Sequence, residues 1–181
     1  MMHDPGDEVT KPTRVDLLDS RDRVDGPQLE VFDHIVASRG KMPPPFAAML
    51  HRPNIARAVA DLGSVIRFDG VISDHDRELV ISVTAWEADC GFEWATHSAL
   101  ALEAGVSEAT LGAVSDDGEV DEPSDSDIVA FTRELSRTGH VGDETFERVV
   151  SRYGEDGTVE LAATVGYYKM VTLFMSACDV C

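Results

Sequence analysis

Four side chains with chemical potential lie close together in the middle of the chain: Glu78, Cys90, Glu93 and His97. Glu93 and His97 are four residues apart, a spacing that places two residues on one face of a helix. A carboxylate beside an imidazole stabilises the imidazolium form, and such a pair can pass a proton near neutral pH. Cys90 precedes Glu93 by one turn, at the expected helix start, where free backbone N–H groups favour a thiolate. The spacing therefore predicts acid–base chemistry, with a reactive thiol as a second possibility.

Two consecutive helices are expected to position these residues. Ser73 is a candidate N-cap for the first helix, which carries Glu78. Asp89 is a candidate cap for the second helix, which is expected to run over about Cys90–Ala104 and to end at Gly105. The two segments together predict a helical hairpin that carries all four side chains.

The hairpin sequence resembles the carboxymuconolactone decarboxylase family, which includes the AhpD-like alkylhydroperoxidases. The AhpD-like members carry a glutamate, a C-x-x-C pair and a histidine, and here Glu78, Cys90 and His97 fall at the glutamate, first cysteine and histidine positions. Glu93 stands at the second cysteine position, and CGFEWATHSALALEAGVS is similar to the branch in which E-W-x-x-H replaces the dithiol. The resemblance extends more weakly over about Met42–Asp179 and includes VGYYKMVTLFMSACDV near the end.

The rest of the chain predicts further helices and no confident strand. Apolar residues recur at helical spacing in the segments that begin near residues 29, 53, 128 and 158. Shorter helices are expected at 46–50, at 108–114 after the cap Ser107, and from the cap Asp143 to about residue 152. The fold class is therefore all-α, and the resemblance implies an oligomeric, AhpD-like helical bundle built around the hairpin. We expect a loose polar N-terminal arm over residues 1–26, a single carboxymuconolactone decarboxylase-like domain over 27–181, and a disordered acidic loop over 115–126.

The composition excludes several classes of function. The formal net charge of −19 over 181 residues opposes binding to nucleic acids and to anionic membranes. The longest apolar stretch, residues 159–178, contains Glu160 and Lys169 and is expected to be a core helix, not a membrane span. No apolar signal segment opens the chain, so a cytoplasmic location is expected.

Metal binding and C-terminal thiol chemistry are weaker possibilities. Cys90, Glu93 and His97 lack the usual H-E-x-x-H and paired C-x-x-C spacings, so we expect neither a metal nor any other cofactor. Cys178 and Cys181 form a C-x-x-C, which can be redox-active, although two incidental thiols at a frayed end are the simpler interpretation. An alternative remains in which Cys90 attacks a peroxide and a tail cysteine resolves the product.

The residues and the resemblance together favour a cofactor-free acid–base enzyme acting on a small carbonyl or lactone acid. The family name implies decarboxylation, and a related lyase, hydrolase or isomerase step would use the same groups. His97 is the expected proton donor, Glu93 the group that recharges it, Glu78 an orienting group and Cys90 part of the pocket lining. The expected substrate-binding residues are aromatic: Trp94, Tyr167 and Tyr168.

A substrate carboxylate would require a cation, for which the candidates are Arg52, Arg67 and Arg77. Two other functions remain open: a thiol-dependent alkylhydroperoxidase using Cys90, and a non-catalytic helical oligomer that binds a ligand. The expected partners are a small-molecule substrate and further copies of the chain in a dimer, trimer or hexamer, with no nucleic acid and no membrane.

Overall fold

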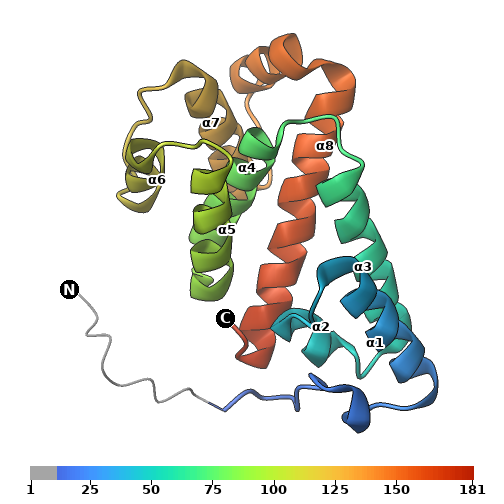
Figure 1. Ribbon diagram of the computed structural model, residues 1–181. Coiled ribbons are helices and arrows are strands. Elements are labelled where there is room, and N and C mark those ends of the chain that lie inside the picture. Colours follow the sequence, from blue (N-terminus) through green and yellow to red (C-terminus); the bar gives the residue numbers. More distant parts are fainter. Residues whose placement is uncertain (1–11) are drawn as a thin grey trace.

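The computed structural model describes residues 12–181, and over this range the chain is built from helices without any strand (Figure 1). This confirms the predicted all-α class. A short 3₁₀ helix, η1 (Arg21–Arg23), precedes the α-helices. These are α1 (Gly26–Arg39), α2 (Pro44–Met49), α3 (Pro53–Phe68), α4 (Asp74–Glu87), α5 (Gly91–Glu103), α6 (Glu108–Ser115), α7 (Pro123–Thr138) and α8 (Asp143–Cys178).

Helix α4 is the centre of the molecule. Its residues Leu79–Ala85 are all buried, because α5, α7 and α8 pack around it. The two hydroxyl groups in this buried stretch donate within the helix: Ser82 Oγ to the carbonyl of Glu78 and Thr84 Oγ1 to the carbonyl of Val80. These bonds satisfy polar atoms that would otherwise be costly to bury.

A second layer, formed by α1–α3, packs against the C-terminal half of α8 (Figure 1). Its core includes Phe32, Ile35 and Leu50, with Phe174 of α8 packed against them. A separate buried cluster joins this layer to the α4–α5 hairpin and comprises Ile66, Ile81, Cys90, Tyr167, Tyr168, Val171 and Met175. The residues expected to do chemistry lie at this junction.

The observed ends of the hairpin helices agree with those predicted from the sequence, except at Asp89. Ser73 caps α4 as predicted, with its Oγ 3.1 Å from the backbone nitrogen of Asp76. Cys90, not Asp89, is the N-cap of α5. Asp89 instead adopts a left-handed conformation (φ 52°), because only three residues separate the two helices and one must reverse the chain direction. Gly105 follows α5 with φ 96°, as expected for a residue at that position.

The acidic segment is more ordered than the sequence suggested. Helix α7 begins at Pro123, so the last part of the predicted 115–126 loop is helical. Proline suits the first turn of a helix, and Asp125 favours its dipole there. Asp125 is buried and accepts a hydrogen bond of 3.0 Å from Thr110 Oγ1.

The two helices expected near the C-terminus are the two parts of α8. Gly154 (φ 66°) breaks the helical backbone between them, a conformation that glycine adopts without strain. The N-cap of α8 is Gly142 and not the predicted Asp143. Over residues 12–181, no helix combines the length and the hydrophobicity needed to cross a bilayer.

The predicted N-terminal arm is only partly within the described residues, since residues 1–11 lie outside them. The boundary of the arm at residue 26 stays a prediction, but several of its residues from 12 onward contact the helices. Leu18 and Val24 are buried in the α1–α3 core. The backbone of Arg14 donates to the carbonyl of Cys178, and that of Leu18 to the carbonyl of Ala47.

Candidate active site

His97 lies between two buried carboxylates. Its Nδ1 is 2.7 Å from Oε2 of Glu78, and its Nε2 is 3.3 Å from Oε2 of Glu93. Glu78 comes from α4 while Glu93 and His97 come from one face of α5, so the hairpin itself creates the arrangement. All three side chains are at least nine-tenths buried. The structure thus brings together three of the four predicted catalytic residues.

The two carboxylates determine the charge of His97. Burial by itself lowers the pKa of His97, but the contacts with Glu78 and Glu93 outweigh burial and raise the pKa above its ordinary value. Burial likewise raises the pKa of Glu78, but His97 and Arg77 outweigh it and leave this pKa below its ordinary value. Arg77 contributes through its Nη2, 3.2 Å from Oε1 of Glu78. Both shifts favour an imidazolium beside an ionised Glu78.

One face of this triad opens onto a cavity of about 250 Å³ between the α1–α3 layer and the hairpin. Tyr168 contacts His97 edge to face, with 5.1 Å between the ring centroids. The full lining comes from five helices (α1, α2, α3, α5 and α8) and the α1–α2 loop: Arg39, Lys41, Pro43, Pro44, Pro45, Phe46, Arg67, Phe92, Glu93, Thr96, His97, Tyr167, Tyr168 and Val171. A small molecule in this space would touch both Glu93 and His97.

Tyr167 and Tyr168 line the cavity in the positions that the sequence suggested for substrate contacts. The hydroxyl of Tyr167 donates to the carbonyl of Val59 (3.1 Å), and burial raises its pKa to about 12. Burial raises the pKa of Tyr168 further still. Gly63 allows this packing, because a Cβ at that position would overlap the Tyr167 hydroxyl. Both phenols therefore stay protonated and can donate hydrogen bonds.

Three cations also line the cavity: Arg39, Lys41 and Arg67. Only Arg67 was among the arginines considered from the sequence. Arg77 contacts Glu78 outside the cavity lining, and Arg52 does not line the cavity either. Arg39 was missed because a cation in the last turn of a helix is common for reasons of the helix dipole alone, and Lys41 lies just after α1, beyond its C-cap Gly40. No motif distinguished them.

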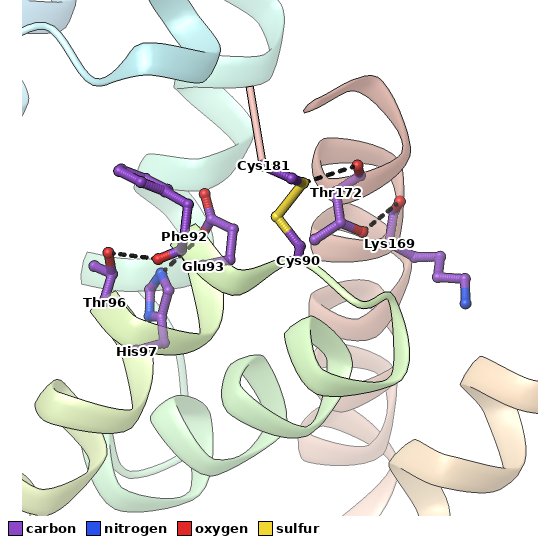
Figure 2. The surroundings of a disulfide bond; sticks show 8 residues. All are labelled: Cys90, Phe92, Glu93, Thr96, His97, Lys169, Thr172 and Cys181. Atoms are coloured by element: carbon purple, nitrogen blue, oxygen red, sulfur yellow. Dashed lines mark hydrogen bonds and ion pairs between the residues drawn. A yellow bond between two sulfur atoms is a disulfide. The ribbon is translucent and has the colours of Figure 1, made fainter. Parts of the chain in front are cut away.

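Cys90 does not line this cavity, contrary to expectation. It is buried at the start of α5 and forms a disulfide with Cys181, whose Sγ lies 3.8 Å from the carbonyl of Thr172 on α8 (Figure 2). The cysteine therefore faces the end of the chain beside α8. Cys178 does not take part in the disulfide.

Trp94 also lies elsewhere. It packs against Trp86, with 4.9 Å between the ring centroids, and against the core formed by α4–α8. Successive helical residues are rotated by about 100°, so the neighbour of a cavity-facing Glu93 points to a different side of α5. The prediction that Trp94 contacts the substrate has no support from its position.

The resemblance to the carboxymuconolactone decarboxylase family is confirmed by a match to the model of that family over residues 53–126. The matched segment contains α3–α6 and hence Glu78, Glu93 and His97. A search of curated proteins found no match.

Solved structures show where the fold belongs. The AhpD core of an uncharacterised peroxidase-related protein from Ralstonia eutropha JMP134 matches with a TM-score of 0.75 and 14% identity, over 93% of this chain and 91% of that chain. A cysteine-to-alanine variant of the debrominase Bmp8 in complex with 2,3,4-tribromopyrrole matches with a TM-score of 0.73 and 22% identity, over 93% and 92%. The apo debrominase matches with a TM-score of 0.71 and 21% identity, over 96% of this chain and 91% of that chain. The predicted AhpD-like helical bundle is therefore confirmed as the fold.

Proposed function

We propose that the protein is a cofactor-free enzyme that moves a proton at a carbon next to the carbonyl group of a small organic acid. The observation that carries the proposal is the row Glu78–His97–Glu93, which ends at a cavity. Glu78 at Nδ1 favours a proton on that nitrogen in the neutral ring and leaves Nε2 to exchange protons with Glu93 and the substrate.

The chemistry of the lining residues supports this assignment. Proton removal from such a carbon, or loss of carbon dioxide from it, leaves an enolate that must be stabilised and reprotonated. His97 is the proposed proton donor to carbon, and Glu93 the group that restores its proton. The Tyr168 hydroxyl makes no hydrogen bond within residues 12–181, so it is the proposed donor to the enolate oxygen. Decarboxylation, isomerisation and lactone opening all fit this set of groups.

The size of the cavity limits the substrate. About 250 Å³ is below the range typical of sites for drug-sized ligands, and a single five- or six-membered ring with its substituents suits it. The debrominase neighbour was crystallised with a ligand of this size class, a brominated pyrrole. Aromatic and proline side chains provide the apolar walls.

Deuterium exchange tests the proposal without knowledge of the natural substrate. Small lactone and keto acids would be incubated with the protein in D₂O, and deuterium uptake beside the carbonyl followed by proton NMR. We expect exchange with wild type and a loss of about 10²-fold in Glu93→Gln. Glu103→Gln, an exposed glutamate on the same helix, is the matched control and should exchange like wild type. Absence of exchange across the panel, or equal rates in Glu93→Gln, would contradict the proposal.

A thiol-dependent hydroperoxidase is the second candidate, and the Cys90–Cys181 disulfide is the observation in its favour. Cys90 thiolate would attack the peroxide O–O bond to give an alcohol and a sulfenic acid, and Cys181 would displace water to form the disulfide. An external thiol would then have to reduce it. Cys90 is 1% exposed and lies outside the cavity lining, which favours the acid–base proposal.

In a non-catalytic oligomer, the third possibility, Glu93 and His97 would be expected to face solvent or a subunit contact and not a pocket. Their burial beside a cavity favours catalysis instead. Homo-oligomer formation and a cytoplasmic location stay predictions. Apolar side chains exposed on α3, including Ile55, Leu62, Val65 and Phe68, offer one surface for self-association, which light scattering would test.

A further inference from the structure

The arginines of this protein differ in their partners. Nine of its twelve arginines form an ion pair with an acidic side chain within residues 12–181. The exceptions are Arg39, Arg52 and Arg67, and two of these, Arg39 and Arg67, line the cavity. In a chain with 34 acidic residues, such arginines would be expected to find a partner unless their position is kept free of carboxylates.

Arg67 is the least satisfied of these cations. None of its N–H groups donates a hydrogen bond to any part of the chain that the structure describes, and its Nε is buried. A buried donor on a charged group without an acceptor is costly, and such groups in native proteins call for a specific explanation. A ligand with an anionic group would provide the missing acceptors.

Arg39 is held in place by neutral groups. Its Nη2 donates to the carbonyl of Ala60 (2.9 Å), its Nη1 to Ser38 Oγ (2.7 Å), and its guanidinium stacks over the Phe46 ring at 4.6 Å. Burial, and in addition the like charge of Arg67, lower the pKa of Arg39 below its ordinary value. The side chain is thus fixed and its charge is not neutralised, which is the arrangement of a preformed anion site.

We infer that Arg39 and Arg67 form a carboxylate-binding subsite, with Lys41 at the cavity lining beside it. Guanidinium groups match the geometry of a carboxylate and bind it more strongly than a neutral group of the same shape. The reacting end of the ligand would lie toward Glu93 and His97, a part of the inference that rests on the proposed function. The cations come from the α1–α3 layer and the acid–base groups from α5, so the two ends of the substrate are held by opposite walls.

The subsite also indicates which substrate carboxylate is retained. Loss of carbon dioxide removes the negative charge from the leaving carboxylate. Arg39 and Arg67 would stabilise that charge in the ground state more than in the transition state, and so would slow this step. The carboxylate they bind therefore remains on the product, and the reaction takes place at another position of the ring.

Calorimetric titration with two matched probes tests the subsite. The probes are 2-furoate and the neutral 2-furamide, in a buffer of low salt without phosphate or sulfate. We expect 2-furoate to bind wild type about tenfold more tightly or better, since a charge-assisted hydrogen bond is worth a factor of this order. Arg67→Gln should remove most of the difference without changing the affinity for 2-furamide. Arg67 makes no hydrogen bond within the described chain, so its replacement leaves no partner unsatisfied.

The control variant is Arg57→Gln, on the same helix but exposed and paired with Asp61. It should bind both probes like wild type, and circular dichroism would verify the fold of each variant. Equal affinities for the two probes, unchanged 2-furoate binding in Arg67→Gln, or no binding of 2-furoate at millimolar concentration would each overturn the subsite. If 2-furoate binds as expected but deuterium exchange is absent, the proposed function fails and the subsite stands.

Discussion

Two clusters that each include a carboxylate of α4 combine a histidine with acidic side chains in different ways. In one, Nδ1 of His75 is 3.1 Å from Oδ1 of Asp76 and its Nε2 is 3.7 Å from Oδ1 of Asp125. In the other, His97 lies between Glu78 and Glu93 at 2.7 and 3.3 Å. Each cluster places one imidazole between two buried carboxylates. Asp76 and Glu78 are two residues apart, which turns them by about 200° to different sides of the helix.

The surroundings of the two clusters differ. In the His75 cluster, Nη2 of Arg152 is 3.5 Å from Asp76, and Thr110 donates to Asp125. These contacts link the first turn of α4 to α6, α7 and α8 and satisfy the carboxylates within the protein. None of these residues lines the cavity beside His97. The His97 cluster, in contrast, opens onto that cavity and faces cations that form no ion pair with an acidic side chain of residues 12–181. Access to a ligand, and not residue type, separates a structural network from a candidate catalytic one.

The largest expected effect on the deuterium exchange rate comes from replacing one histidine at a time. His97→Gln should lower the deuterium exchange rate by about 10²–10⁴-fold, the usual contribution of a general acid or base. His75→Gln should leave the rate within about twofold of wild type, because a network away from the cavity supports only the fold. NMR rates on both variants provide the comparison. Equal losses in the two variants would mean that the clusters do not differ in function.

The disulfide beside the His97 cluster should affect stability and not proton transfer. It closes a loop of 91 residues between Cys90 and Cys181, and reduction or Cys181→Ser should lower the free energy of unfolding by about 2–4 kcal/mol. The exchange rate should stay unchanged, since neither sulfur lines the cavity. Denaturant titration with and without a reductant measures the first quantity. Exchange that disappears on reduction would instead give the thiols a part in the chemistry.

The His75 cluster should respond to Asp125→Asn with a loss of stability alone. The amide keeps the shape but loses the charge that faces His75, so we expect a cost of about 1–2 kcal/mol. Asp127→Asn, two residues along and more exposed, is the matched control. Thermal unfolding measures the difference. A fall in deuterium exchange in Asp125→Asn, at full occupancy of the folded state, would place this cluster in the catalytic machinery.

The contrast between the clusters also shows what the sequence could predict. The i, i+4 spacing of Glu93 and His97 depends only on local helix geometry, and the family resemblance added Glu78, so three members of the site were predicted. Arg39 depends on how α1 packs against α3 and α8, and neither spacing nor composition reports that contact. Trp94 was assigned to the pocket because it is close in sequence, but a helix turns neighbouring side chains to different sides. Cys90 was expected one turn before Glu93 on the same face, but it is the N-cap of α5 with an extended backbone (φ −105°, ψ 93°), so helical spacing does not apply to it.

The sequence also failed to predict that two polar segments are ordered, for a related reason. Asp125 lies in a run of acidic and small residues that is typical of a solvated loop, and Thr110 from α6 and His75 from α4 help to make its burial favourable. Leu18 and Val24 lie in a segment rich in charged residues, and their contribution depends on the core of the α1–α3 layer. In both segments the stabilising partner is distant in sequence.

The last prediction concerns pH. Because the contacts with Glu78 and Glu93 raise the pKa of His97 above 6.5, the imidazolium should persist past this pH. Exchange that needs the imidazolium should hold through pH 6.5 and fall only at higher pH. The raised pKa also contributes stability that is fully present below the unfolded-state pKa of histidine and is lost as the pH rises through the folded-state pKa. Glu78→Gln removes one of the two carboxylates, so the fall of the exchange rate with rising pH, the alkaline limb of the profile, should move to lower pH. A limb that stays in place would show that Glu78 does not set the charge of His97, and NMR titration of the His97 ring would verify which group titrates.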